Sequence, residues 1–117
     1  MVHFVVKKLA ATFYRSPAGS EPVRGWLRGL SRDERREIGR DVATVEYGWP
    51  VGMPACRPLG QGLWEIRSVL PGGRTARVMF CIAQARMVLL HGFVKKTPKA
   101  PDDDLALARK RMKEIER

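Results

Sequence analysis

The sequence has few cysteines, and this scarcity excludes several kinds of site. Cys56 and Cys81 are the only two, and neither belongs to a CxxC motif or to a cluster with histidine. A structural zinc site is therefore not expected, and two free thiols in a reducing compartment are favoured over a disulfide. No phosphate-binding loop of the GxxxxGK[ST] or GxGxxG type occurs, so we expect neither a metal nor a cofactor.

Long apolar runs are also missing. No stretch approaches the roughly 20 apolar residues that a membrane-spanning helix needs. The charges at the start of the chain follow the apolar residues, and that apolar run is too short for a signal peptide. These absences predict a soluble, cytoplasmic protein with no membrane partner.

Acidic residues are scarce in the second half, and none occurs between Glu65 and Asp102. Over the whole chain, 22 arginines and lysines stand against 12 acidic residues, which gives a net charge of +10. A domain this basic favours an anionic partner, such as nucleic acid, an acidic membrane surface or an acidic protein. The acid-free interval contains seven cations: Arg67, Arg74, Arg77, Arg86, Lys95, Lys96 and Lys99.

The length of 117 residues and the hydrophobic fraction of 44% fit a single domain over residues 1–117. Periodicity and turn residues predict a strand at 2–7, a connection at 12–19, two helices that meet near Leu30-Ser31, and a last helix that opens at Asp102. Ser20 is expected to cap the first helix, and Ser31 with Glu34 forms a capping box for the second. Further strands are predicted at 57–59, 63–69, 74–82 and 87–94. Local hairpins then predict an α+β fold with a mainly antiparallel sheet and helices on one face.

Alternation along the predicted strands assigns cations to one face of the sheet. The apolar positions of the other face are Trp64, Ile66, Ala76, Val78, Phe80, Val88, Leu90, Gly92 and Val94. The cationic face receives Arg67, Arg77, His91, Phe93 and Lys95, and Lys96 stands at the strand end. Cations interleaved with an aromatic ring are typical of a platform for single-stranded RNA. The alternative is an ordinary solvated sheet face, and His91 is then a structural histidine.

Three segments and the basic helix after them resemble a known family. The segments are Leu59-Gly60-Gln61-Gly62-Leu63-Trp64-Glu65-Ile66-Arg67, Arg77-Val78-Met79-Phe80 and Leu89-Leu90-His91-Gly92-Phe93-Val94-Lys95-Lys96-Thr97-Pro98. They resemble the HigB branch of the RelE-like toxins, whose members are often described as phage-derived toxin-like proteins. The match in element order covers nearly the whole chain, and its distinctive residues lie in the second half. The N-terminal part, including the insertion around Trp49 to Pro58, contributes less to the resemblance.

The resemblance implies a RelE-like fold, with an N-terminal helical hairpin, a small sheet and a C-terminal helix. It implies the toxin of a type II toxin–antitoxin system, which cleaves mRNA on the ribosome without a metal. The expected partners are mRNA on the ribosome and a HigA-like helix-turn-helix antitoxin. Members of the same superfamily also include ParE-like inhibitors of DNA gyrase, and a non-catalytic nucleic-acid-binding or antitoxin-binding protein is a third alternative.

The resemblance also implies roles for individual residues. Arg67 matches a basic residue of the middle strand, and Arg77 matches the arginine that holds the scissile phosphate. Lys95 and Lys96 match a basic pair at the strand end, and His91 is a candidate proton donor or base. Arginine is a poor base at neutral pH, so Arg67 and Arg77 are better assigned to charge stabilisation. The remaining expected RNA contacts are Arg74, Phe93 and Lys99.

Two features depart from the family pattern. Many relatives have a tyrosine or histidine near the C-terminal end of the site, and the last helix here has neither. Glu65 stands where some members have a lysine, which puts a negative charge beside the expected site.

Overall fold

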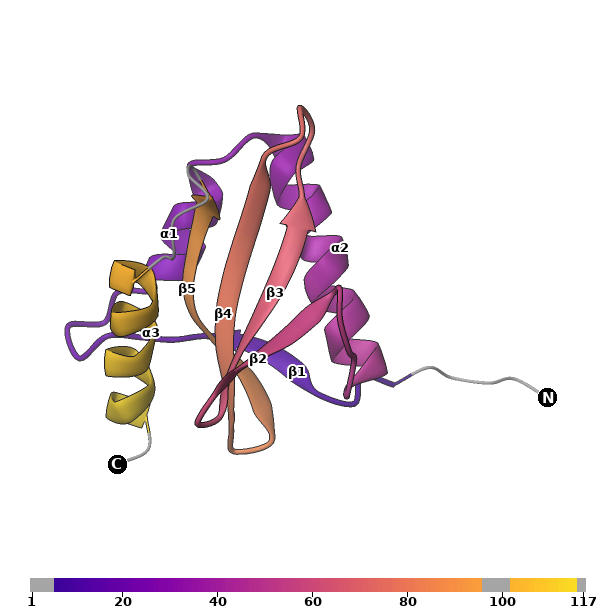
Figure 1. The fold of residues 1–117 in the computed structure, drawn as a ribbon. Coiled ribbons are helices and arrows are strands. Elements are labelled where there is room, and N and C mark those ends of the chain that lie inside the picture. Colours follow the sequence, from indigo (N-terminus) through magenta and orange to yellow (C-terminus); the bar gives the residue numbers. More distant parts are fainter. Residues whose placement is uncertain (1–5, 96–101, 116–117) are drawn as a thin grey trace.

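The computed structural model describes residues 6–95 and 102–115, which form a five-stranded sheet and three helices. In chain order the elements are β1 (Ala10–Phe13), α1 (Pro22–Arg28), α2 (Arg32–Gly48), β2 (Cys56–Gly60), β3 (Leu63–Val69), β4 (Thr75–Ala83), β5 (Arg86–Lys95) and α3 (Asp102–Ile115). The strand order is β1-β5-β4-β3-β2, and Figure 1 shows β5, β4 and β3 side by side. β1 runs parallel to β5, and the other neighbours are antiparallel. The α+β class is confirmed, with a mixed sheet.

The first strand was predicted in the wrong place. Residues 6 and 7 are not in a strand, residues 1–5 lie outside the described residues, and β1 begins at Ala10 instead. Two alanines carry little strand propensity. β1 exists because it pairs with β5 and because its Ala11 N–H donates to the buried Glu46 carboxylate at 2.7 Å. β1 also precedes α1 and α2, so the helix pair is not the first element of the chain.

The helices cover both faces of the sheet, which corrects the expectation of helices on one face. α2 runs along the β3 side of the sheet, whereas α3 lies beside β5 (Figure 1). α1 and α2 bury a first core with Ile66, Val78 and Phe80. α3 closes a second core on the other face, built from Tyr14, Leu63, Met79, Cys81, Val88, Leu90, Ala108 and Met112. Two cores form because β3, β4 and β5 carry apolar side chains at both parities.

A β-bulge in β5 decides which residues face α3. Met79 pairs with His91 but the next residue, Phe80, pairs with Leu89, so Leu90 is the extra residue. The bulge turns Val88 and Leu90 to the α3 face, and the assignment of both to the other core was wrong. Arg111 of α3 donates to the Leu90 carbonyl at 2.7 Å, which satisfies the backbone where the ladder is interrupted.

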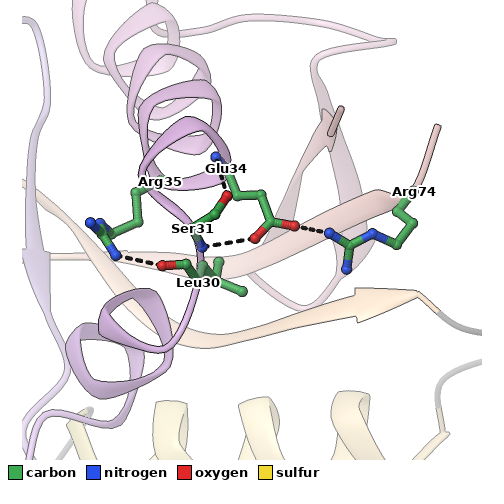
Figure 2. Close-up of polar contacts among 5 residues, drawn as sticks. All are labelled: Leu30, Ser31, Glu34, Arg35 and Arg74. Carbon is green, nitrogen blue, oxygen red and sulfur yellow. Dashed lines mark hydrogen bonds and ion pairs between the residues drawn. The ribbon is translucent and has the colours of Figure 1, made fainter. Parts of the chain in front are cut away.

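The N-terminus of α2 forms the capping box that was predicted from the sequence. Ser31 Oγ accepts from the Glu34 N–H at 3.2 Å, and the Glu34 carboxylate accepts from the Ser31 N–H at 2.8 Å. Figure 2 shows this capping box together with Arg74, whose guanidinium bonds the same Glu34 carboxylate. The cap expected for α1 is wrong by one residue, because Glu21 is the N-cap and has no side-chain cap bond.

The first core contains a thiol whose ionisation is coupled to folding. Burial raises the pKa of Cys56 to about 11, against an ordinary value of 9.0. The folded protein therefore keeps a proton that the unfolded chain loses above about pH 9. The contribution of this thiol to the free energy of unfolding is fully present below pH 9 and is lost as the pH rises towards 11. The loss is on the order of 2 kcal/mol, with a limiting slope of about 1.4 kcal/mol per pH unit. Urea unfolding between about pH 8 and pH 10 measures this loss, and Cys56→Ala should show a shallower decline. If the free energy of unfolding fell equally steeply with pH in the wild type and in Cys56→Ala, the coupling would be contradicted.

Candidate functional site

An arginine cluster lies where β2, β3 and β4 run side by side, on the face that α3 covers further along. Register places Arg57 opposite Glu65, and Arg67 opposite Arg77. Glu65 Oε1 accepts from Arg57 Nη2 at 3.1 Å and lies 3.4 Å from Arg77 Nη1. The Glu65 side chain is 3% exposed, Arg77 11% and Arg57 43%. One buried carboxylate is thus shared by two guanidinium groups.

The cluster contains donors and an acceptor that have no hydrogen-bond partner among the described residues. Arg57 Nε and Arg77 Nε are buried without a hydrogen-bond partner in the described part of the chain, and so is Glu65 Oε2. Arg67 is exposed, and its side chain makes no ion pair or hydrogen bond with any residue the structure describes. An exposed arginine without a partner, beside two further guanidinium groups, is suited to an anion.

A small surface pocket opens among these side chains. Its volume is about 120 Å³. The pocket can take a phosphate-sized group, whereas drug-sized ligands occupy roughly 300 Å³ or more. Its lining residues are Met53, Pro54, Arg57, Glu65, Arg67 and Arg77. Met53 and Pro54 add an apolar wall to a basic pocket.

The second part of the site lies on β5. His91 and Phe93 stack with ring centroids 5.6 Å apart and planes at 22°. His91 Nε2 lies 2.6 Å from Asp104 Oδ1 in the first turn of α3. Phe93 is the register partner of Arg77, and Lys95 is opposite Thr75. The β5 residues therefore share the face of Arg67 and Arg77, as alternation predicted.

The structure does not bring all the predicted site residues together. Arg74 follows the β3–β4 turn and bonds Glu34 on α2, which packs on the opposite face of the sheet. Lys96 and Lys99 lie outside the described residues. Arg57 was missed, because a short strand in a segment rich in glycine and proline gives a weak signal for register.

Two cations of α3 hold the helix on the sheet. Arg109 donates to the Leu59 carbonyl at 2.9 Å, in the strand before the β2–β3 turn. Arg111 lies 5.5 Å from the centre of the Tyr14 ring, in addition to its bond with Leu90. Burial and the hydrogen bond to Glu114 raise the pKa of Tyr14. Arg109 and Arg111 thus serve the packing of the fold, and Lys110 and Lys113 are the exposed cations of this helix.

The described part of the chain offers no candidate for a metal site or for a membrane-spanning helix. Over residues 6–95 and 102–115, no group of three histidine, cysteine or acidic side chains is placed to hold a metal ion. None of the three described helices is long and apolar enough to cross a membrane.

The sequence matches the model of a known family. The family described as Phage derived protein Gp49-like (DUF891) matches residues 25–113, from within α1 to the last turns of α3. The chain therefore belongs to the Gp49-like family of phage-derived proteins, a family associated with the toxins of toxin–antitoxin systems. The matched span contains the arginine cluster, the β5 residues and Asp104. No curated protein matches the sequence significantly.

Proposed function

We propose that this protein is the toxin of a type II toxin–antitoxin system, a HigB-like member of the RelE superfamily with a RelE-like fold. In this proposal it acts in the cytoplasm and cleaves mRNA on the ribosome without a metal ion. The observation that carries the proposal is the direct pairing of Arg67 with Arg77 across β3 and β4. Membership of a toxin-associated family supports it.

Two cations directly opposite each other on a sheet destabilise it unless an anion lies between them. Glu65 offsets only part of this charge, since it is shared between Arg57 and Arg77. Three guanidinium groups and one carboxylate leave a net charge of +2 around a pocket of phosphate size. An RNA phosphate supplies the missing anion, and Phe93 offers a ring for base stacking beside it.

RNA carries its own nucleophile, so the protein needs to supply only orientation, charge stabilisation and proton transfer. The ribose 2′-oxygen forms a bond to the adjacent phosphorus as its proton passes to a base. The bond from phosphorus to the 5′-oxygen breaks, and that oxygen takes up a proton. A 2′,3′-cyclic phosphate and a 5′-hydroxyl result. In this scheme Arg67 and Arg77 bind the phosphate oxygens, His91 transfers protons, and Lys95 with Lys96 adds positive charge.

The proposal also includes two partners. The mRNA is presented by the ribosome, whose RNA adds anionic surface for a protein with net charge +10. A HigA-like helix-turn-helix antitoxin, encoded beside the toxin, would neutralise it by covering the basic face or by blocking entry to the ribosome.

Arg67→Ala is the sharpest test, because this side chain is exposed and its loss breaks no hydrogen bond or ion pair with a described residue. Controlled expression of the wild type should arrest bacterial growth and create new mRNA 5′ ends inside translated reading frames. Arg67→Ala should lose both effects, with a fall in cleavage of about 100-fold or more. The matched control is Arg36→Ala, which removes an exposed arginine of α2 and should keep both.

Other outcomes would replace the proposal. Growth arrest with a DNA-damage response and without such cuts would favour the ParE-like gyrase inhibitor. No arrest by the wild type would favour a non-catalytic protein that binds nucleic acid or an antitoxin.

A further inference from the structure

His91 is held from two directions by neighbours on different elements. Its Nε2 atom contacts Asp104 Oδ1 on α3 at 2.6 Å, and its ring stacks on Phe93 of β5. The His91 side chain is 15% exposed and that of Asp104 is 32% exposed. The orientation of the ring is therefore fixed both at its Nε2 edge and at its stacked face. An ordinary surface histidine lacks these two constraints.

The contact with Asp104 determines where the imidazole proton lies. An ionised carboxylate only accepts hydrogen bonds, so Nε2 must donate and carry the proton. Nδ1 then holds the free lone pair of the neutral ring. Nδ1 has no hydrogen-bond partner among the described residues. His91 thus keeps an unpaired proton acceptor at its second ring nitrogen.

The position of His91 connects this acceptor to the arginine cluster. Phe93 is opposite Arg77, and His91 is opposite Met79, two residues along β4. His91 and Arg77 are therefore diagonal neighbours on one face, about 7–8 Å apart at the backbone. A group bound by Arg77 lies within reach of the His91 ring.

We propose that Asp104 is a positioning residue for His91, and this inference rests on the proposed endoribonuclease function. Asp104 fixes the Nε2–H tautomer and directs Nδ1 towards the ribose 2′-hydroxyl. Nδ1 takes the 2′-proton as the oxygen–phosphorus bond forms, and the carboxylate stabilises the imidazolium that results. When the bond to the 5′-oxygen breaks, the imidazolium returns its proton to that oxygen, which restores the neutral ring.

Helix capping alone does not account for Asp104. Asp102, Asp103 and Asp104 all lie in the first turn of α3, where any carboxylate interacts favourably with the helix dipole. Asp102 and Asp103 are exposed, whereas Asp104 is partly buried against the sheet and bonds His91. Asp103→Asn is therefore a matched control, because it removes the same charge from the same turn and leaves the His91 contact in place.

The tautomer can be measured without any activity. The chain of 117 residues, labelled with ¹⁵N, contains two histidines, His3 and His91, and His3→Gln assigns the two rings. The wild type should show His91 protonated at Nε2 and unprotonated at Nδ1 when the ring is neutral. Asp104→Asn can donate to Nε2 through its amide, so the proton should move towards Nδ1, whereas Asp103→Asn should keep the wild-type tautomer. A wild-type His91 that is protonated mainly at Nδ1 would overturn the proposal.

Cleavage of mRNA on purified ribosomes supplies the second readout. Asp104→Asn should lower the maximal rate by about 10- to 100-fold and leave KM within about twofold, because proton transfer is impaired and binding is not. Asp103→Asn should match the wild type. Equal rates in the two variants, or a loss confined to KM, would overturn the positioning role. If the wild type itself does not cleave, the proposed function fails, and the tautomer result still decides whether Asp104 orients His91.

Discussion

Gly92→Ala is expected to destabilise the protein by about 3 kcal/mol, because a β-carbon at this position has no room. It would lie 2.3 Å from both Cε3 and Cζ3 of Trp26, in the helix that packs on β5. Both sides of this contact are fixed: Gly92 is in the middle of a central strand, and a ring is rigid. Either α1 must move away from the sheet or the β5 ladder must bend.

Gly39→Ala is the matched control for this substitution. Gly39 lies in the middle of α2, is exposed, and has no neighbouring atom within 4 Å of the place where a β-carbon would stand. Alanine there should be neutral or stabilise the helix by about 0.5–1 kcal/mol. Urea unfolding followed by tryptophan fluorescence measures both variants. A Gly92→Ala protein as stable as the wild type would mean that α1 does not pack on β5 as described. Trp26→Leu should restore part of the loss in the double variant, since it removes the clashing ring atoms.

Arg77→Ala is expected to abolish growth arrest and mRNA cleavage, and also to lower stability. Arg77 is nearly buried and shares Glu65 with Arg57, so its loss leaves a buried carboxylate with one partner. The stability cost should be about 1–3 kcal/mol, which is less than for a fully orphaned charge because Arg57 remains. Thermal unfolding and circular dichroism measure this cost separately from the effect in cells.

Arg77→Lys separates charge from geometry at the same position. Lysine keeps a cation beside Glu65 but lacks the planar fork that binds two phosphate oxygens together. Its stability should fall between those of the wild type and Arg77→Ala, and cleavage should still drop by about 10-fold or more. A folded Arg77→Ala protein that arrests growth fully would remove Arg77 from the proposed mechanism.

Much of the second half of the fold could be predicted from local pattern. β3 was predicted with its observed bounds, and α3 begins at Asp102 as expected. The turn between β3 and β4 uses Gly72 and Gly73 with positive φ, as the Pro-Gly-Gly sequence indicated. In α2, Ser31 and Glu34 form the capping box that their spacing predicts. Each of these features depends on residues close together in the chain.

The site was predictable only in part, because alternation gives the face of a residue but not its partner. Arg67, Arg77, His91, Phe93 and Lys95 lie on one face, as their parity indicated. The sequence did not indicate that Arg74 would be bonded to Glu34 of α2, 40 residues away. Nor could it show that Asp104 contacts His91, since that contact depends on where α3 docks.

The sequence by itself determined the charge of the protein, the hairpins of β3, β4 and β5, and the helices that begin at a capping box or an acidic turn. Tertiary structure alone decided the place of β1, the bulge at Leu90, the packing of α3 on the second face, and the sharing of Glu65 by two arginines. The reason is physical: turns and caps are stabilised by neighbours in sequence, whereas strand register and helix docking depend on burial that only the assembled sheet provides.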